Sequence, residues 1–212
     1  MLSGCVTFAA PPPLVTAGGA GTVAPQHAEV AVGVGTGVAL FERAHSGGTA
    51  WMGRWRTGVT DRLDLGADMM GAAHGDTGTF NAKVAARYQL LPRARLEAGV
   101  GAADNSDGKS LSAEMALTLG SNDPARTWNR YLSLRGAAAK GYPENVLGLG
   151  PEGDIAPPPD ALFGLVNLGT TGRISPNQRV FFEAGVGYIA PRGETPGPLI
   201  FWGVGLLADI GK

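Results

Sequence analysis

The sequence predicts an all-β protein, an antiparallel up-and-down transmembrane β-barrel of about ten strands, with eight as the alternative number. Three observations predict this fold. From residue 27 onward, apolar and polar residues alternate with period two, and turn residues interrupt the alternation at fairly even intervals. One face of the alternating segments is almost free of charge. The segments are about ten residues long, which suits a tilted membrane strand better than a soluble strand of about five or six.

The composition excludes several classes of protein. Only 17% of the 212 residues are charged and 34 are glycine, whereas soluble domains average about a quarter charged residues. The formal net charge is -1 and no Lys/Arg cluster is present, so we expect no nucleic-acid partner. No apolar run approaches the roughly 18 residues of a membrane helix, which leaves a closed barrel as the way to cross a bilayer.

Residues 1–26 are expected to form a tether outside the barrel domain of residues 27–212. Leu2-Ser3-Gly4-Cys5 resembles the lipobox of bacterial lipoproteins. This resemblance implies that a signal sequence is removed and that Cys5 carries a lipid such as palmitate. Behind it, residues 9–26 are rich in Pro and Gly and almost uncharged, which is typical of a flexible tether. The charged and apolar regions of a signal peptide do not precede the box, so a disordered terminus with an unmodified cysteine is the alternative.

The single cysteine excludes an internal disulfide and a Cys-based metal cluster. We expect neither a metal nor a cofactor. The alternation defines the expected strands as residues 28–41, 50–59, 62–73, 79–90, 93–103, 110–120, 127–139, 161–173, 178–189 and 199–210.

Short, turn-like connections alternate with longer ones along the chain. If the first strand begins on the periplasmic side, every short turn is periplasmic and every longer loop is extracellular, as in outer-membrane barrels. The longest connection contains the Pro-rich loop 141–159, which is the candidate surface for a protein partner. The short turns lie at residues 60–61, 91–92, 121–124 and 175–177, and the longer loops at residues 42–49, 74–78, 104–109, 140–160 and 191–198.

The two faces of the expected strands differ in polarity. We expect the apolar face, which carries Val34, Leu111 and Val204, to contact lipid, and the polar face to line the interior. Glycine and alanine on the polar face leave room for long charged side chains. Six cations and six carboxylates on this face are expected to pair as a plug in a narrow lumen. This lumen charge network comprises Glu29, Arg54, Arg56, Asp64, Asp68, Lys83, Arg87, Arg95, Glu97, Glu114, Arg135 and Glu183.

Aromatic residues of the apolar face fall near the strand ends, apart from Trp55. Such residues predict an aromatic girdle at the two membrane–water interfaces. The girdle comprises Trp51, Phe80, Tyr88, Trp128, Phe182, Tyr188 and Trp202. A few apolar residues lie on the polar parity instead, where we expect a bulge or a partner contact: Phe163, Leu165, Leu199, Phe201 and Leu207.

The stretch from Gly203 to Ile210 resembles the last strand of small outer-membrane barrels of the OmpA or opacity-protein kind. The resemblance extends as a pattern over residues 27–212, although the terminal aromatic residue common in that group is missing. It implies a location in the outer membrane of a Gram-negative bacterium, with outer-membrane lipid around the barrel.

For function, we expect a non-enzymatic structural or interaction component that displays its outer loops. Three alternatives are a narrow channel, a barrel enzyme acting on lipid or peptide at the outer rim, and a soluble lipocalin-like periplasmic binder. The enzyme would use His45, Ser46, His74 and Asp76 on the first two outer loops. Solvated loop histidines are the simpler interpretation, because neither a third ligand nor a spaced carboxylate pair accompanies them.

Overall fold

The computed structural model describes residues 21–41, 44–74, 77–105, 108–121, 123, 126–142, 159–193 and 195–211. Within these ranges the secondary structure consists of ten strands, and no helix is long and apolar enough to cross a membrane. The strands are β1 (Ala28–Phe41), β2 (Ala44–Thr60), β3 (Leu63–His74), β4 (Thr77–Leu91), β5 (Ala94–Asn105), β6 (Gly108–Gly120), β7 (Trp128–Tyr142), β8 (Ala161–Ser175), β9 (Gln178–Pro191) and β10 (Gly197–Ile210).

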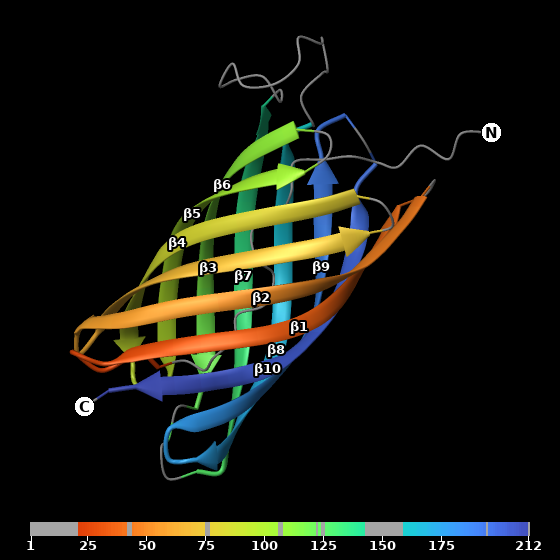
Figure 1. The fold of residues 1–212 in the computed structure, drawn as a ribbon. Coiled ribbons are helices and arrows are strands. Elements are labelled where there is room, and N and C mark those ends of the chain that lie inside the picture. The colour runs from red at the N-terminus through yellow and green to blue at the C-terminus, as the bar shows by residue number, and fades with distance from the viewer. Residues whose placement is uncertain are drawn as a thin grey trace.

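The ten strands form one closed antiparallel barrel (Figure 1). Each strand pairs with its neighbours in the chain, and β1 closes the barrel by pairing with β10 from Ala28↔Ile210 to Ala39↔Leu199. Closure leaves no unpaired strand edge, as a bilayer requires. The predicted fold class is confirmed, and the number of strands is ten, not eight.

Several strands are longer than the sequence predicted, so the connections at the long-loop end are shorter. β2 begins at Ala44, within the loop expected at residues 42–49, and β10 begins at Gly197. The alternation of hydropathy marks only the part of a strand that separates two environments, whereas main-chain pairing continues beyond it. The connection between Tyr142 and Ala161 remains the longest. The β2–β3, β4–β5, β6–β7 and β8–β9 connections, which the sequence predicted as short turns, lie at the opposite end, which we call the short-turn end. The β1–β2, β3–β4 and β5–β6 connections, expected to be longer loops, are two residues long, because the strands on either side extend into them.

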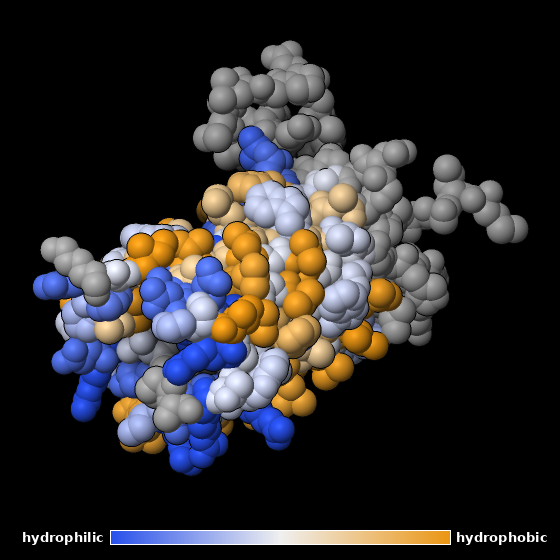
Figure 2. Space-filling model, turned by 60° about the horizontal axis from the view of Figure 1, so that its bottom comes forward, coloured by the Kyte–Doolittle hydropathy of each residue, from blue (hydrophilic) through white to orange (hydrophobic). Residues whose placement is uncertain are grey.

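Most large apolar side chains of the strands point outward, and the twelve residues of the predicted lumen charge network point inward. Val34 and Leu111 are each 55% exposed, whereas Asp64 and Arg87 have 0% exposure. Figure 2 shows the apolar residues spread over the outer wall and polar residues gathered toward the short-turn end. Soluble monomers rarely expose apolar patches larger than a few hundred Å². This outer wall is therefore suited to hydrocarbon, and the lipocalin-like alternative, which needs the apolar face inside, is wrong.

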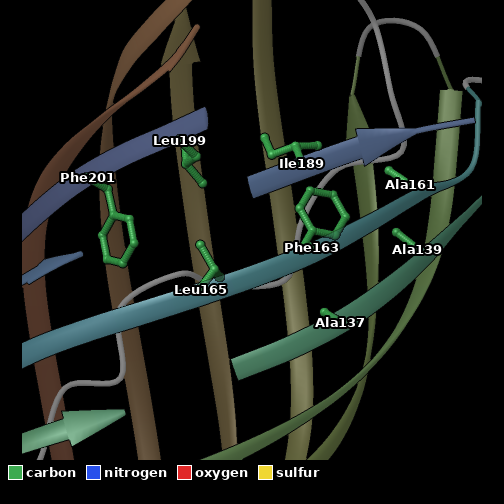
Figure 3. Close-up of a cluster of buried hydrophobic side chains, with 8 residues drawn as sticks. All are labelled: Ala137, Ala139, Ala161, Phe163, Leu165, Ile189, Leu199 and Phe201. Atoms are coloured by element: carbon green, nitrogen blue, oxygen red, sulfur yellow. The ribbon is translucent and has the colours of Figure 1, made fainter. Parts of the chain in front are cut away.

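Part of the interior is apolar, which the sequence analysis did not expect. One cluster on β7 to β10 contains Phe163, Leu165, Ile189, Leu199 and Phe201 (Figure 3). A second cluster contains Ala31, Met52, Phe181 and Leu207. The expectation of a bulge is wrong for the first cluster, because the register of β8 shifts only between Arg173 and Ser175, beyond these residues.

Glycines on the facing strands make room for these interior aromatic rings. A Cβ atom at Gly33 would lie 2.7 Å from Cζ of Phe181 and 2.9 Å from the carbonyl oxygen of Val204. Such contacts are too close for a real side chain, so the ring of Phe181 occupies the space that glycine leaves free. The glycine-rich inner face thus accommodates aromatic rings as well as charged side chains.

Candidate functional site in the charged lumen

Strand register places opposite charges directly across from one another inside the barrel. Asp68 on β3 faces Arg54 on β2 and Lys83 on β4. Arg87 on β4 likewise faces Asp64 on β3 and Glu97 on β5. Directly opposed charges of opposite sign stabilise a strand pair. All twelve residues of the predicted lumen charge network are buried.

Asp68 and Lys83 connect the largest group of ion pairs. The Asp68 carboxylate accepts two hydrogen bonds from Arg54, at 2.5 Å from Nε and 2.7 Å from Nη2. Lys83 Nζ lies 3.0 Å from Oδ2 of Asp68 and 2.9 Å from Oε1 of Glu97, and it also donates to Oε1 of Glu114 on β6. One ammonium group thus contacts carboxylates from three strands, β3, β5 and β6.

Arg87 extends this group toward the short-turn end. Its Nε donates to Oε2 of Glu97 at 2.7 Å, and its Nη1 donates to Oδ1 of Asp64 at 3.2 Å. Arg135 on β7 joins the group through Glu114, with 3.6 Å between Nη1 and Oε2. The ion pairs therefore run without interruption from β2 to β7.

A second ionic group lies at the joint between the first and last strands. Arg179 on β9 has its Nη2 2.8 Å from Oε2 of Glu29 on β1 and 2.8 Å from Oδ1 of Asp209 on β10. Arg56 Nη1 is 3.5 Å from Oε1 of Glu29. Arg179 and Asp209 were missed by the sequence analysis, because strand ends give a weak parity signal.

Glu183 on β9 is held by neutral donors. The Tyr131 hydroxyl donates to Oε2 at 3.0 Å, and the Asn167 amide donates to Oε1 at 2.6 Å. Tyr131 and Asn167 are themselves buried. Both residues lie on the inward parity of their strands, but neutral polar side chains on that parity do not stand out in the sequence as charged ones do.

The chain before β1 folds back against the mouth of the lumen at the short-turn end. We call residues 21–27 the mouth strap. It turns at Gln26, which has a φ of 64°, and His27 N donates to the carbonyl oxygen of Ala24 at 3.1 Å. Pro25 forms a parallel bridge with Gly58 of β2.

The mouth strap binds the buried charges through its main chain. Val23 N donates to Oδ2 of Asp64 at 3.1 Å, and Arg95 Nη1 donates to the carbonyl oxygen of Gly21 at 2.9 Å. These residues were predicted to belong to a flexible tether, and that expectation is wrong for residues 21–27. The contact requires glycine at position 58, because a side chain there would collide with the carbonyl oxygens of Val23 and Ala24.

The structure describes the backbone of three of the four candidate catalytic residues. The backbone puts His45 and Ser46 in β2 and His74 at the end of β3, and not on loops as expected, because both strands are longer than predicted. Asp76, Cys5 and residues 143–158 of the long loop lie outside the described residues. Within the described part of the chain, no group of three His, Cys, Asp or Glu side chains could hold a metal ion.

The residues of the predicted aromatic girdle all lie on the outer wall. Trp51, Tyr188 and Trp202 are 50 to 54% exposed. The Trp51 and Phe80 rings, on β2 and β4, have centroids 6.3 Å apart. Tyr88, Trp128 and Phe182 are also exposed. Their role at the membrane–water interfaces stays a prediction.

The arrangement inside the barrel places cations and carboxylates in contact along the wall formed by β2 to β7. In a confined, low-dielectric interior, breaking a pair leaves an uncompensated charge at high cost. The described interior therefore acts chemically as a set of mutually neutralised charges beside an apolar wall.

Comparison with known proteins gives a fold likeness and no family. No family model and no curated protein matches the chain. OmpT, an outer membrane protease from Escherichia coli, is 10% identical with a TM-score of 0.43, over 87% of this chain and 96% of OmpT. Ail, the attachment invasion locus protein of Yersinia pestis, is 10% identical with a TM-score of 0.39, over 88% and 99%. The outer membrane protein OprG from Pseudomonas aeruginosa is 12% identical with a TM-score of 0.36, over 92% and 100%.

The fold assignment depends on the chain's own geometry. Ten antiparallel strands close on themselves, large apolar side chains cover the outside, and charged side chains are buried within. Spanning barrels of this kind belong to outer membranes. The chain is a transmembrane β-barrel of the bacterial outer membrane.

Proposed function

We propose that the protein is a non-enzymatic structural or interaction component of the outer membrane, with a closed lumen and displayed outer loops. The observation that carries the proposal is the contact of Lys83 with carboxylates from β3, β5 and β6. These contacts fix the Lys83 ammonium group inside the barrel and neutralise its charge with carboxylates of three strands. The apolar cluster on β7 to β10 fills the opposite wall.

Planar-bilayer recording tests the closed lumen. Barrels inserted in the folded state, verified by heat-modifiable gel migration, are expected to show no discrete conductance steps. Steps that disappear when Arg135 is changed to Ala would establish the narrow channel instead. Arg135 suits this control because it is buried on the inner wall and contacts Glu114.

Display of the loop at residues 141–159 is the interaction part of the proposal. A long connection on a rigid barrel is where binding surfaces usually lie. The sequence supplies Glu144 and Glu152 within this loop, whereas the barrel glutamates Glu29, Glu97, Glu114 and Glu183 are buried. A glutamate-specific protease added to intact cells is expected to release fragments ending at residue 144 or 152. Absence of both fragments would contradict outward display.

Acylation of Cys5 is also proposed, on the strength of the lipobox-like Leu2-Ser3-Gly4-Cys5. Growth with a clickable palmitate analogue is expected to label the protein, and Cys5→Ser is expected to abolish the label. Equal labelling of both proteins, or labelling of neither, would contradict the proposal.

We assign no catalytic role to His45 or His74. Their backbones lie in β2 and at the end of β3. Replacing both with Ala is expected to leave outer-membrane lipid profiles and surface proteolysis unchanged. A change in either would favour the enzyme.

A further inference from the structure

The mouth strap becomes more buried toward its amino-terminal end. Ala24, Gln26 and His27 are exposed, whereas Gly21, Thr22 and Val23 are partly buried. The barrel residues that contact the strap are more buried in the same direction. Pro25 contacts Gly58 near the end of β2, whereas Val23 and Gly21 contact Asp64 and Arg95, which have 0% exposure. Followed from Pro25 back to Gly21, the chain therefore passes from the rim to groups inside the barrel.

Several buried polar side chains in the lumen have spare hydrogen-bonding capacity, and Arg95 and Asn81 are among them. Among the described residues, Nε and Nη2 of Arg95 have no partner, and no carboxylate lies within 4.0 Å of its guanidinium. The amide of Asn81 on β4 is also buried, and neither its oxygen nor its nitrogen has a partner among these residues. Buried polar groups normally find partners.

Arg95 and Asn81 occupy different depths of the lumen. Arg95 lies at the start of β5, near the short-turn end, whereas Asn81 lies two positions beyond Lys83 toward the long-loop end. Guanidinium N–H groups donate to carbonyl oxygens, and an amide can both donate to and accept from a peptide group. Both are groups that bind the main chain of an extended peptide.

We propose that the lumen is a binding site for an extended peptide main chain and that its occupant is the protein's own segment 1–20, which enters through the mouth strap. Arg95 continues to donate to carbonyl oxygens beyond Gly21, and Asn81 binds a peptide group farther along. The proposal goes beyond the closed lumen, which depends on side chains of the barrel wall.

The chemistry of the segment matches the lumen. Residues 1–20 contain no charged side chain, so they add none to a lumen with six cations and six carboxylates. Three consecutive prolines, Pro11 to Pro13, bring carbonyl acceptors without N–H donors. Leu14 and Val15 are apolar, as is the cluster on β7 to β10.

The segment is also long enough for this path. Residues 5–20, which remain if Cys5 becomes the amino terminus, span about 53 Å when extended at about 3.3 Å per residue. A bilayer with its headgroups is about 40 to 45 Å thick. A segment of this length can therefore pass Arg95 and reach Asn81.

Cysteine protection tests the proposal. In a Cys5→Ser background, Thr16→Cys places a thiol five residues before Gly21, and Asn177→Cys provides an exposed control in the β8–β9 turn. The probe is a polyethylene-glycol maleimide too large to enter the lumen. In the folded barrel, Thr16→Cys is expected to react at least roughly tenfold more slowly than Asn177→Cys, and as fast after unfolding.

Variants at the mouth show whether Thr16→Cys is protected because the segment enters the lumen through the mouth strap or for another reason. Gly58→Val, which would collide with the carbonyl oxygens of Val23 and Ala24, is expected to bring the rate of Thr16→Cys close to that of the control. Arg95→Met should act in the same direction. Gly136→Val is the matched control, because a Cβ there meets nothing within 4 Å. Only protein with heat-modifiable migration is scored.

Fast labelling of Thr16→Cys in the folded, otherwise unaltered barrel would overturn the proposal. So would protection that neither Gly58→Val nor Arg95→Met relieves, because the segment would then not enter through the strap. Either result would leave the closed-lumen proposal standing, since that proposal is tested by conductance.

Discussion

Arg54 and Asp68 face each other across β2 and β3, with 2.5 Å between Nε and Oδ1 and 2.7 Å between Nη2 and Oδ2. Both side chains are at most 1% exposed. A two-point contact of this kind fixes the guanidinium plane and gives the strongest form of a charged hydrogen bond. Asp68 also lies beside Lys83 and Arg87, so the two partners are not equivalent.

Asp68→Asn is expected to destabilise the barrel more than Arg54→Gln. The asparagine would leave Arg54, Lys83 and Arg87 without a shared counter-charge, a loss of about 3 to 5 kcal/mol in the free energy of unfolding. Arg54→Gln leaves Asp68 with two cations, so its loss is smaller. Urea unfolding in lipid vesicles measures both.

The exposed pair of Asp123 and Arg126 provides the control for this comparison. These side chains are 45% and 59% exposed, at 3.4 Å. Asp123→Asn is expected to cost at most about 1 kcal/mol. A cost for Asp68→Asn no greater than this would contradict the proposed burial of the network.

Phe181→Ala and Phe182→Ala are expected to differ although the residues are neighbours. Phe181 is 0% exposed inside the lumen, whereas Phe182 is 48% exposed on the outer wall. Removing the inner ring leaves a cavity and costs about 3 to 5 kcal/mol. Lipid chains can fill the space left by the outer ring, so its loss should be smaller. Equal losses in vesicle unfolding would count against the interior cluster.

Gly33→Ala is expected to destabilise the barrel, and Gly136→Ala is not. A methyl group at Gly33 would lie 2.7 Å from Cζ of Phe181, whereas one at Gly136 meets nothing within 4 Å. Overpacking of this kind costs about 1 to 3 kcal/mol. The temperature at which heat-modifiable migration is lost measures the difference, and matching temperatures would refute it.

Val84→Arg tests the contact of the outer wall with hydrocarbon. Val84 is 59% exposed and pairs with Val100 in the middle part of β4 and β5. An arginine facing the bilayer midplane costs about 2 to 4 kcal/mol, but near an interface about 0 to 1 kcal/mol. Leu91→Arg, at the end of β4, is therefore the control. If Val84→Arg costs no more than Leu91→Arg, the wall does not contact hydrocarbon.

Parity in the sequence was sufficient to predict the faces of the strands. Arg87 and Val84 lie three residues apart, on opposite faces of β4, and alternation alone separates them. Parity could not predict the polarity of each part of the interior. Phe163 and Arg135 are both buried within the barrel on β8 and β7, and only the assembled sheet shows that one joins an apolar cluster while the other meets Glu114.

The mouth strap was beyond sequence reasoning for a different reason. Its contacts join residues 74 and 41 positions apart, from Gly21 to Arg95 and from Val23 to Asp64. Main-chain atoms make these bonds, so the identities of Gly21 and Val23 carry little signal. Gly58, whose missing side chain lets the strap approach, resembles any other glycine in a glycine-rich chain.

Arg179 stabilises the native register between the first and last strands, β1 and β10. A slip of two residues between β1 and β10 would keep every side chain on its proper face, so hydrophobicity cannot distinguish the shifted pairing from the native one. It would separate Glu29 from Asp209, which sit opposite each other and share the Arg179 guanidinium. The ion pairs of Arg179 with Glu29 and Asp209 therefore stabilise the native register of β1 and β10 relative to a shifted register that exposes the same residues to lipid.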